Sequence, residues 1–234
     1  FYHSISHRGA FSSGSSIFFE KSAGFVIRHM WSAPNGVAIA IGDSGLVMQR
    51  NTDGTWQDVV QLGSDHVLEG IAGDASEVLI VGAVGLDALA LHSAFSPLVP
   101  AVETLPVATL APLRSVSTPN LGHAWAVGHN RTLLLRKSGI WTTQPLPSPP
   151  ADGKQYDLLD IAGPLGATYV AVGKEGQVIR FDDDGTGVVT NIVVETIPTL
   201  AVLTTVAAVP ETNEFIIADV NGEIWASQGS ASWL

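Results

Sequence analysis

The sequence predicts an all-β chain, folded as a β-propeller of four-stranded antiparallel blades, because two landmarks recur about every 45 residues, five times over. The first landmark is a pair of apolar residues three positions apart, found at Ile27/Met30, Leu68/Ile71, Leu113/Val116, Leu158/Ile161 and Leu203/Val206. The first members of these pairs lie 41, 45, 45 and 45 residues apart. The second landmark is an apolar strand that ends in a tight turn, found at 39–45, 79–85, 125–131, 170–176 and 216–222. Two independent landmarks that keep one period indicate a repeat architecture.

One repeat, residues 113–146, shows the expected strands in order. Residues 113–120 alternate and end at a Pro-Asn turn signal, and 123–128 form a short apolar strand that ends in glycine. Residues 131–137 and 140–146 follow, separated by Ser-Gly. Each segment has the length of a strand, and none has the helical period of apolar residues over ten or more positions. The repeat therefore predicts one four-stranded blade.

Such a sheet cannot bury both faces alone, but sheets stacked around an axis cover one another. We expect the blades at 25–64, 66–106, 110–149, 156–198 and from 200 onward. Trp56, Trp141 and Trp233 recur where a fourth strand begins. We expect these rings to fill the widening gap between blades at larger radius, with carbohydrate stacking as the alternative role.

The fifth blade has three strands before the sequence ends near Trp233. Residues 15–21 (SSIFFEK) alternate and are aromatic, so we expect them to supply the missing outer strand and close a five-bladed ring. Residues 1–14 then form an N-terminal arm, and 15–234 form a single domain. The alternative is that Trp233 begins a strand that continues in a longer chain with six or more blades.

Composition limits the classes of partner. The formal net charge is −11, with only 11 basic residues scattered along the chain, so binding to nucleic acid or to anionic membranes is not expected. Apolar runs are interrupted well before 18 positions, which predicts a soluble domain without a transmembrane helix. The chain has no cysteine, which excludes disulfides, thiol catalysis and thiolate metal sites. The first 16 residues are rich in serine and contain no acid. They are either a flexible arm or the remnant of a targeting segment, and we expect an extracytoplasmic or organellar location rather than a cytoplasmic one.

The stretches at 38–56, 123–141, 169–187 and 215–233 share the pattern of an apolar strand, a G-x-x-G-like turn, a second apolar strand and a Gly-containing turn. This pattern resembles the Asp-box, or BNR-type, propeller repeats of bacterial surface proteins and of photosystem II assembly-factor propellers. Residues 51–56 keep the Asp, Gly and Trp of the box, whereas residues 92–98 have lost it. The resemblance implies a propeller fold over residues 25–234 and a structural role for the box in the turn between the third and fourth strands.

Sialidases share this repeat, but their chemistry requires three convergent arginines and a tyrosine nucleophile with a carboxylate partner. Arg50, Arg136 and Arg180 fall at equivalent positions in three blades, which indicates repeat geometry rather than one pocket. The three tyrosines show no obvious partner acid, and the histidines show no metal-ligand spacing. We therefore expect no catalytic residues, no metal and no cofactor.

In a propeller, the turns between second and third strands emerge on one face, together with the connections between blades. We call this face the turn face. Its polar turn residues are the candidate binding residues Asp43, His129, Asn130, Arg131, Lys174, Glu175, Asp219 and Asn221. The equivalent turn of the second blade is apolar, and a mixed surface of this kind suits a protein partner. We expect a non-catalytic interaction or scaffold module that serves as an accessory subunit or assembly factor. The alternatives are a glycan-binding propeller and a degenerate sialidase-like glycosidase.

Overall fold

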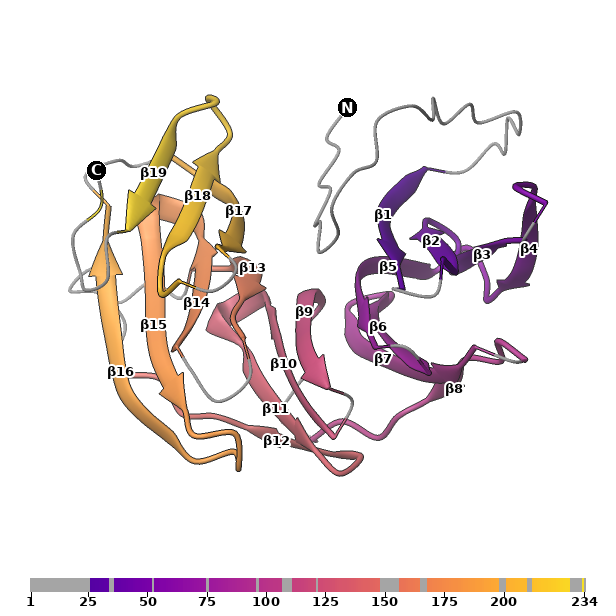
Figure 1. Cartoon of the computed structure of the whole chain (residues 1–234), viewed down its shortest axis with the longest axis horizontal. Coiled ribbons are helices and arrows are strands. Elements are labelled where there is room, and N and C mark those ends of the chain that lie inside the picture. The colour runs from indigo at the N-terminus through magenta and orange to yellow at the C-terminus, as the bar shows by residue number, and fades with distance from the viewer. Residues whose placement is uncertain are drawn as a thin grey trace.

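The computed structural model describes residues 26–33, 36–51, 53–74, 76–95, 97–106, 111–120, 122–147, 156–164, 168–197, 201–209, 212–227 and 233. They form five antiparallel sheets, four with four strands and one with three. The sheets follow one another around a common axis, each with its first strand innermost (Figure 1). The fold is therefore the predicted propeller, and the five sheets match the five expected blades.

Each blade runs outward in chain order. Blade one consists of β1 (Ile27–Ser32), β2 (Ala38–Gly42), β3 (Leu46–Arg50) and β4 (Trp56–Gln61). Blade two consists of β5 (His66–Gly73), β6 (Glu77–Val84), β7 (Asp87–Ala94) and β8 (Ala101–Val102). Blade three consists of β9 (Leu113–Asn120), β10 (His123–Gly128), β11 (Leu133–Lys137) and β12 (Ile140–Thr143).

Blade four consists of β13 (Leu158–Ala162), β14 (Thr168–Gly173), β15 (Gln177–Asp183) and β16 (Val189–Thr196). Blade five consists of β17 (Leu203–Ala208), β18 (Phe215–Asp219) and β19 (Ile224–Ser227). Single 3-10 turns, η1 (His129–Arg131) and η2 (Lys174–Gly176), join the second and third strands of blades three and four.

The hydrophobic core is a series of layers between neighbouring blades. Residues of blades one and two share one cluster, and the pairs two–three, three–four and four–five share the next three. The apolar pair of each later blade, such as Leu113 and Val116, packs against the blade before it. Burial between blades therefore explains why this pair recurs in the sequence, since no blade can cover its own faces.

A β-bulge in every inner strand explains the spacing of three within the pair. Residues three apart in a regular strand face opposite sides of the sheet. In β1, β5, β9, β13 and β17 the residue after the first apolar position has no partner in the register, so the second apolar position returns to the same side. The five bulged residues are Arg28, Glu69, Arg114, Leu159 and Thr204.

The bulge also explains the glycine at or near the end of the second strand in the first four blades. A Cβ atom at Gly128 would lie 2.2 Å from the carbonyl oxygen of Pro112, just ahead of the bulge. The same contact would be 2.0 Å at Gly42, Gly82 and Gly173. Only glycine permits this approach of two backbones. In blade five the equivalent residue is Asp219.

The described part of blade five has three strands, and Trp233 forms an isolated bridge with Ser227 of β19. Trp233 therefore lies beside the third strand, where the sequence predicts the start of a fourth. The segment expected to close this blade, residues 15–21, lies outside the described residues, as does the expected arm at 1–14.

Candidate functional site

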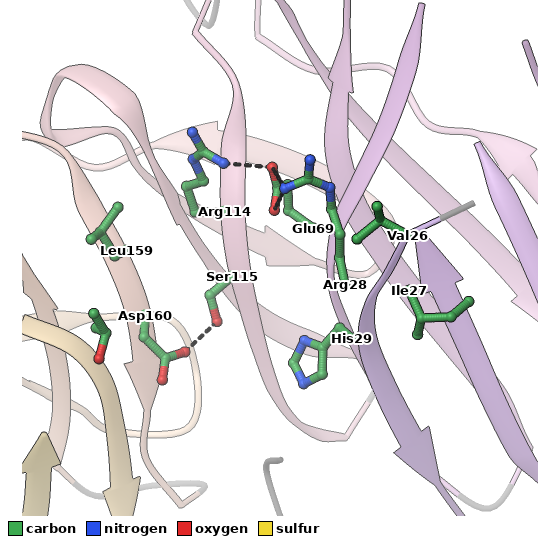
Figure 2. Close-up of a pocket in the computed structure, with 10 residues that line it drawn as sticks. Val26, Ile27, Arg28, His29, Glu69, Arg114, Ser115, Leu159 and Asp160 are labelled. Atoms are coloured by element: carbon green, nitrogen blue, oxygen red, sulfur yellow. Dashed lines mark hydrogen bonds and ion pairs between the residues drawn. The ribbon is translucent and has the colours of Figure 1, made fainter. Parts of the chain in front are cut away.

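The five inner strands surround a pocket of about 370 Å³, which we call the axial pocket (Figure 2). All five bulged residues line it, and together they form what we call the bulge ring. Bulges re-aim side chains. Here they turn one side chain from each blade toward the axis, so the register irregularity that organises the core also builds the pocket.

Glu69 lies between two arginines that come from the blades on either side of it (Figure 2). Nη1 of Arg114 donates to Oε1 of Glu69 at 2.5 Å, and Nη1 of Arg28 lies 3.3 Å from the same oxygen. Nε of Arg28 donates to Asp43. Burial lowers the pKa of Arg28, but the hydrogen bond to Asp43 and the charges of Glu69 and Asp43 outweigh it and raise the pKa above its ordinary value. The Arg28 guanidinium therefore stays charged.

The residues that directly follow the bulged residues form a second layer at the axis, which we call the second ring. Hydrogen bonds converge on one of them, Asp160. Its Oδ1 accepts from Ser115 Oγ at 2.7 Å and from the backbone N of Ile161 at 2.9 Å. Its Oδ2 accepts from Thr205 Oγ1 at 3.0 Å and from the backbone N of Val206 at 2.9 Å. Asp160 thus joins blades three, four and five at the axis, and its role is structural.

His29 lies in the second ring and lines the pocket near Asp160 (Figure 2). Burial lowers the pKa of His29, although the charge of Asp160 opposes this. The imidazole is therefore neutral at neutral pH.

The network continues from the bulge ring to the turn face through blades three and four. Nε of Arg114 donates to Nε2 of His129 at 2.9 Å, so that nitrogen carries no proton. Asp157 accepts from Lys174 Nζ at 2.6 Å and from the backbone N of Asn130 at 3.1 Å. Burial raises the pKa of Asp157, but these hydrogen bonds and the nearby positive charges outweigh it and lower the pKa below its usual range.

Burial also lowers the pKa of His129, and the positive charges of Arg114 and Lys174 act in the same direction. The charge of Asp157, whose Oδ1 lies 4.0 Å from Nδ1 of His129, opposes the shift. His129 therefore stays neutral and remains an acceptor for Arg114.

The structure connects some of the predicted turn residues to the pocket and separates others. Asp43 and His129 contact the arginines of the bulge ring directly. Lys174 and the backbone of Asn130 meet at Asp157.

The other four predicted residues lie apart from the pocket network. Asp219 is buried and accepts from the backbone N of Asn221 at 2.8 Å, so this pair shapes its own turn. Arg131 is also buried, and its Nη1 donates to the carbonyl oxygen of Pro147 at 3.2 Å. Glu175 is exposed, with a positive φ of 56°.

Sequence reasoning missed the bulge ring and Asp157. The signal was present, because Arg28, Glu69 and Arg114 each follow the first member of an apolar pair that the repeat identifies. In three repeats a charged residue lies between the two members of the apolar pair, which indicates that this position does not face the core. The convergence of these three residues becomes visible only when blades one, two and three stack with their inner strands side by side.

Two of the recurrent tryptophans form clasps between blades, in which each indole donates to a glutamate of the preceding blade. Arg136 and Arg180 bind the same two glutamates, so these arginines do not converge on one pocket. Glu103 accepts from Nε of Arg136 at 2.8 Å and from Nε1 of Trp141 at 2.6 Å. Two repeats later, Glu195 accepts from Nε of Arg180 at 2.9 Å and from Nε1 of Trp233 at 2.7 Å. Each tryptophan lies 38 residues after its glutamate. Trp141 lies in the apolar cluster shared by blades two and three, and Trp233 packs against the cluster shared by blades four and five, as expected of rings that fill the gap between blades.

Metal-binding clusters and membrane-spanning helices are both absent from the ranges that the structure describes. No group of three or more His, Cys, Asp or Glu side chains in these ranges is placed to hold a metal ion. Within these ranges there is also no helix of the length and hydropathy needed to span a bilayer.

Comparison with known proteins supports the fold. No known family profile matches the sequence, and no curated protein sequence matches it. Among solved structures, YCF48 bound to a D1 peptide is similar, with a TM-score of 0.66, 17% identity, and coverage of 90% of this chain and 66% of that one. Virginiamycin B lyase from Staphylococcus aureus is also similar, with a TM-score of 0.72, 13% identity, and coverage of 89% of this chain and 68% of that one.

The WD40 β-propeller domain of Doa1 gives a TM-score of 0.70 and 14% identity, with coverage of 92% of this chain and 69% of that one. These structural relatives are β-propellers. The chain thus has a propeller fold and spans about two thirds of the length of these structures.

Proposed function

We propose that this chain is a non-catalytic protein-binding propeller, an accessory subunit or assembly factor that holds a peptide segment of its partner at the axial pocket and the adjoining turn face. The observation that carries the proposal is the bulge ring, in which three blades each aim one charged side chain into a single open pocket. Charged side chains placed on rigid inner strands are preorganised for recognition.

The chemistry of the site favours binding over catalysis. Asp160, the carboxylate deepest in the network, already accepts four hydrogen bonds, and Asp157 is held ionised by Lys174 and the Asn130 backbone. A general base needs a free lone pair directed at a substrate proton. These carboxylates instead fix the positions of their donors.

Structural relatives offer a precedent for this use of the fold. One of them, YCF48, is bound to a D1 peptide in its solved structure. At 17% identity this relative supports the capacity of the fold and not the identity of the partner.

Site-specific photo-crosslinking tests the proposal. Glu175 is exposed on the turn face, whereas Ser138 is exposed in the turn between β11 and β12, at the opposite end of its blade. We expect p-benzoylphenylalanine at position 175, in protein expressed in its source, to form a discrete protein adduct that position 138 does not form. Equal adducts from both positions, or none from either, would contradict the proposal.

A further inference from the structure

Hydrogen-bond donors and acceptors in the axial pocket are unequally satisfied. Nε and Nη1 of Arg28 and of Arg114 have partners. Neither Nη2 nitrogen has a hydrogen-bond partner among the described residues. The acceptors Glu69, Asp43 and Asp160 are all engaged by donors. The pocket therefore presents free donors, each carried by a charged guanidinium.

The free donors are accessible to a ligand. The side chains of Arg28 and Arg114 are 36% and 31% exposed, while that of Glu69 between them is 15% exposed. Figure 2 shows the two guanidiniums on either side of the Glu69 carboxylate, above the second ring. The planar fork of arginine matches a carboxylate, so the free Nη2 donor of each guanidinium suits a carboxylate from a ligand.

The pocket also has apolar side chains beside the arginines. Val26, 59% exposed, and Leu159 both line the pocket beside the charged groups. An amphipathic group fits such a site better than a free inorganic anion, since Val26 gains contact only from an apolar neighbour of the charge.

We propose that the axial pocket binds a carboxylate of the partner peptide, flanked by an apolar side chain, through the Nη2 donors of Arg28 and Arg114. The inference rests on the proposed function and specifies its ligand. The shared chemistry is the carboxylate, which the α-carboxylate of a chain terminus or an internal Asp or Glu side chain can supply.

Glu69 acts as a resident competitor in this arrangement. It occupies the position between the two arginines and neutralises part of their charge. Replacing its carboxylate by an amide of the same shape, Glu69→Gln, leaves both arginines without their shared counter-ion. The variant therefore binds a carboxylate ligand more tightly. A purely structural role for the Arg–Glu–Arg group predicts the opposite, since the loss of its central carboxylate loosens the pocket.

Four pools of random octapeptides, immobilised at equal density, test the inference. The first pool has a free C-terminal carboxylate and lacks Asp and Glu. The second is its C-amidated counterpart. The third is amidated with one fixed internal Glu, and the fourth is amidated with Gln at that position. The full chain is applied as the wild type and as the Glu69→Gln, Arg28→Met and Arg114→Met variants. Lys137→Met is the matched control, because Lys137 is exposed at the far end of β11.

We expect the first or the third pool to retain at least tenfold more protein than its amide counterpart, and the pool that does so identifies the source of the carboxylate. Glu69→Gln increases this retention, Arg28→Met and Arg114→Met reduce it to the amide level, and Lys137→Met leaves it unchanged. Near-UV circular dichroism confirms that each variant is folded.

Equal retention by a carboxylate pool and its amide counterpart overturns the inference, as does lower retention of Glu69→Gln than of the wild type. Either result leaves the proposed function standing. Absence of binding to all four pools, with no crosslink at position 175, overturns both.

Discussion

At the scale of single residues, the site consists of charged side chains with fixed partners. His129 illustrates this, because its ring accepts a hydrogen bond from Arg114 only while Nε2 is unprotonated. The groups that face it are Arg114, Lys174, Asp157 and Glu69, and burial together with the two cations lowers its pKa. The turn face is thus sensitive to acid at one identified position.

We expect the free energy of unfolding to fall as the pH is lowered through the ordinary histidine pKa of 6.5. The folded pKa lies below the unfolded one, so the unfolded chain binds more protons in that window and stability rises with pH. His129→Gln keeps an acceptor and removes the titration. Urea titrations at several pH values give the free energy of unfolding as a function of pH. This free energy should change less with pH in the variant than in the wild type. Identical changes with pH in the two proteins would contradict the assignment.

Asp160 provides a second test at this scale. Asp160→Asn replaces a charged acceptor that serves donors from three blades, which should lower the free energy of unfolding by about 1–3 kcal/mol. Asp87→Asn, at an exposed position at the start of β7, is the control and should change it by less than about 0.5 kcal/mol. Equal effects of the two substitutions on the urea midpoint would show that Asp160 is not a structural centre.

At the scale of elements, the clasps between outer strands connect neighbouring blades. Arg136 is 5% exposed, and Glu103 is its partner across the interface between blades two and three. Removing one partner of a buried ion pair leaves an uncompensated charge. The outer strands therefore contribute to stability through few residues in each interface.

Glu103→Ala should lower the free energy of unfolding by about 3–5 kcal/mol, because it removes the carboxylate that accepts hydrogen bonds from both Arg136 and the Trp141 indole. Glu214→Ala, at an exposed turn position before β18, is the matched control. Thermal and urea unfolding would measure both. If Glu103→Ala lowers the free energy of unfolding no more than Glu214→Ala does, the Glu103 clasp does not stabilise the interface between blades two and three.

The elements themselves were predictable from sequence, and the site was only partly so. The repeat landmarks identified the blades because interblade burial imposes one apolar pattern on every repeat, as Leu113 and Leu158 show. The bulge positions follow no such pattern, since they hold Arg, Glu, Arg, Leu and Thr in turn. Side chains 45 residues apart, such as Glu69 and Arg114, meet only because neighbouring blades stack with their inner strands side by side. Asp43 and His129 were found because turn residues are visible in sequence, whereas their partners lie inside strands.

At the scale of the whole molecule, how the ring is completed remains a prediction from sequence. The alternating segment 15–21 is expected to supply the outer strand of blade five, whose described part has three strands. Residues 1–14 are expected to contribute nothing to the domain.

Two deletions separate these expectations. Removing residues 1–14 should leave the thermal midpoint unchanged, whereas removing residues 1–21 should lower it, because an outer strand and its apolar contacts are lost. Differential scanning calorimetry would compare the two deletions with the full chain. Equal midpoints for all three proteins would contradict closure by residues 15–21.

The central claim is that the axial pocket is where a partner protein binds. The most direct measurement is the stoichiometry of partner retained by tagged protein purified from its source, compared among the wild type, Arg114→Met and Lys137→Met. We expect one partner at fixed stoichiometry on the wild type and on Lys137→Met, and we expect Arg114→Met to lose that partner while it remains folded. Equal retention by all three proteins, or no retained partner on any of them, would contradict the claim.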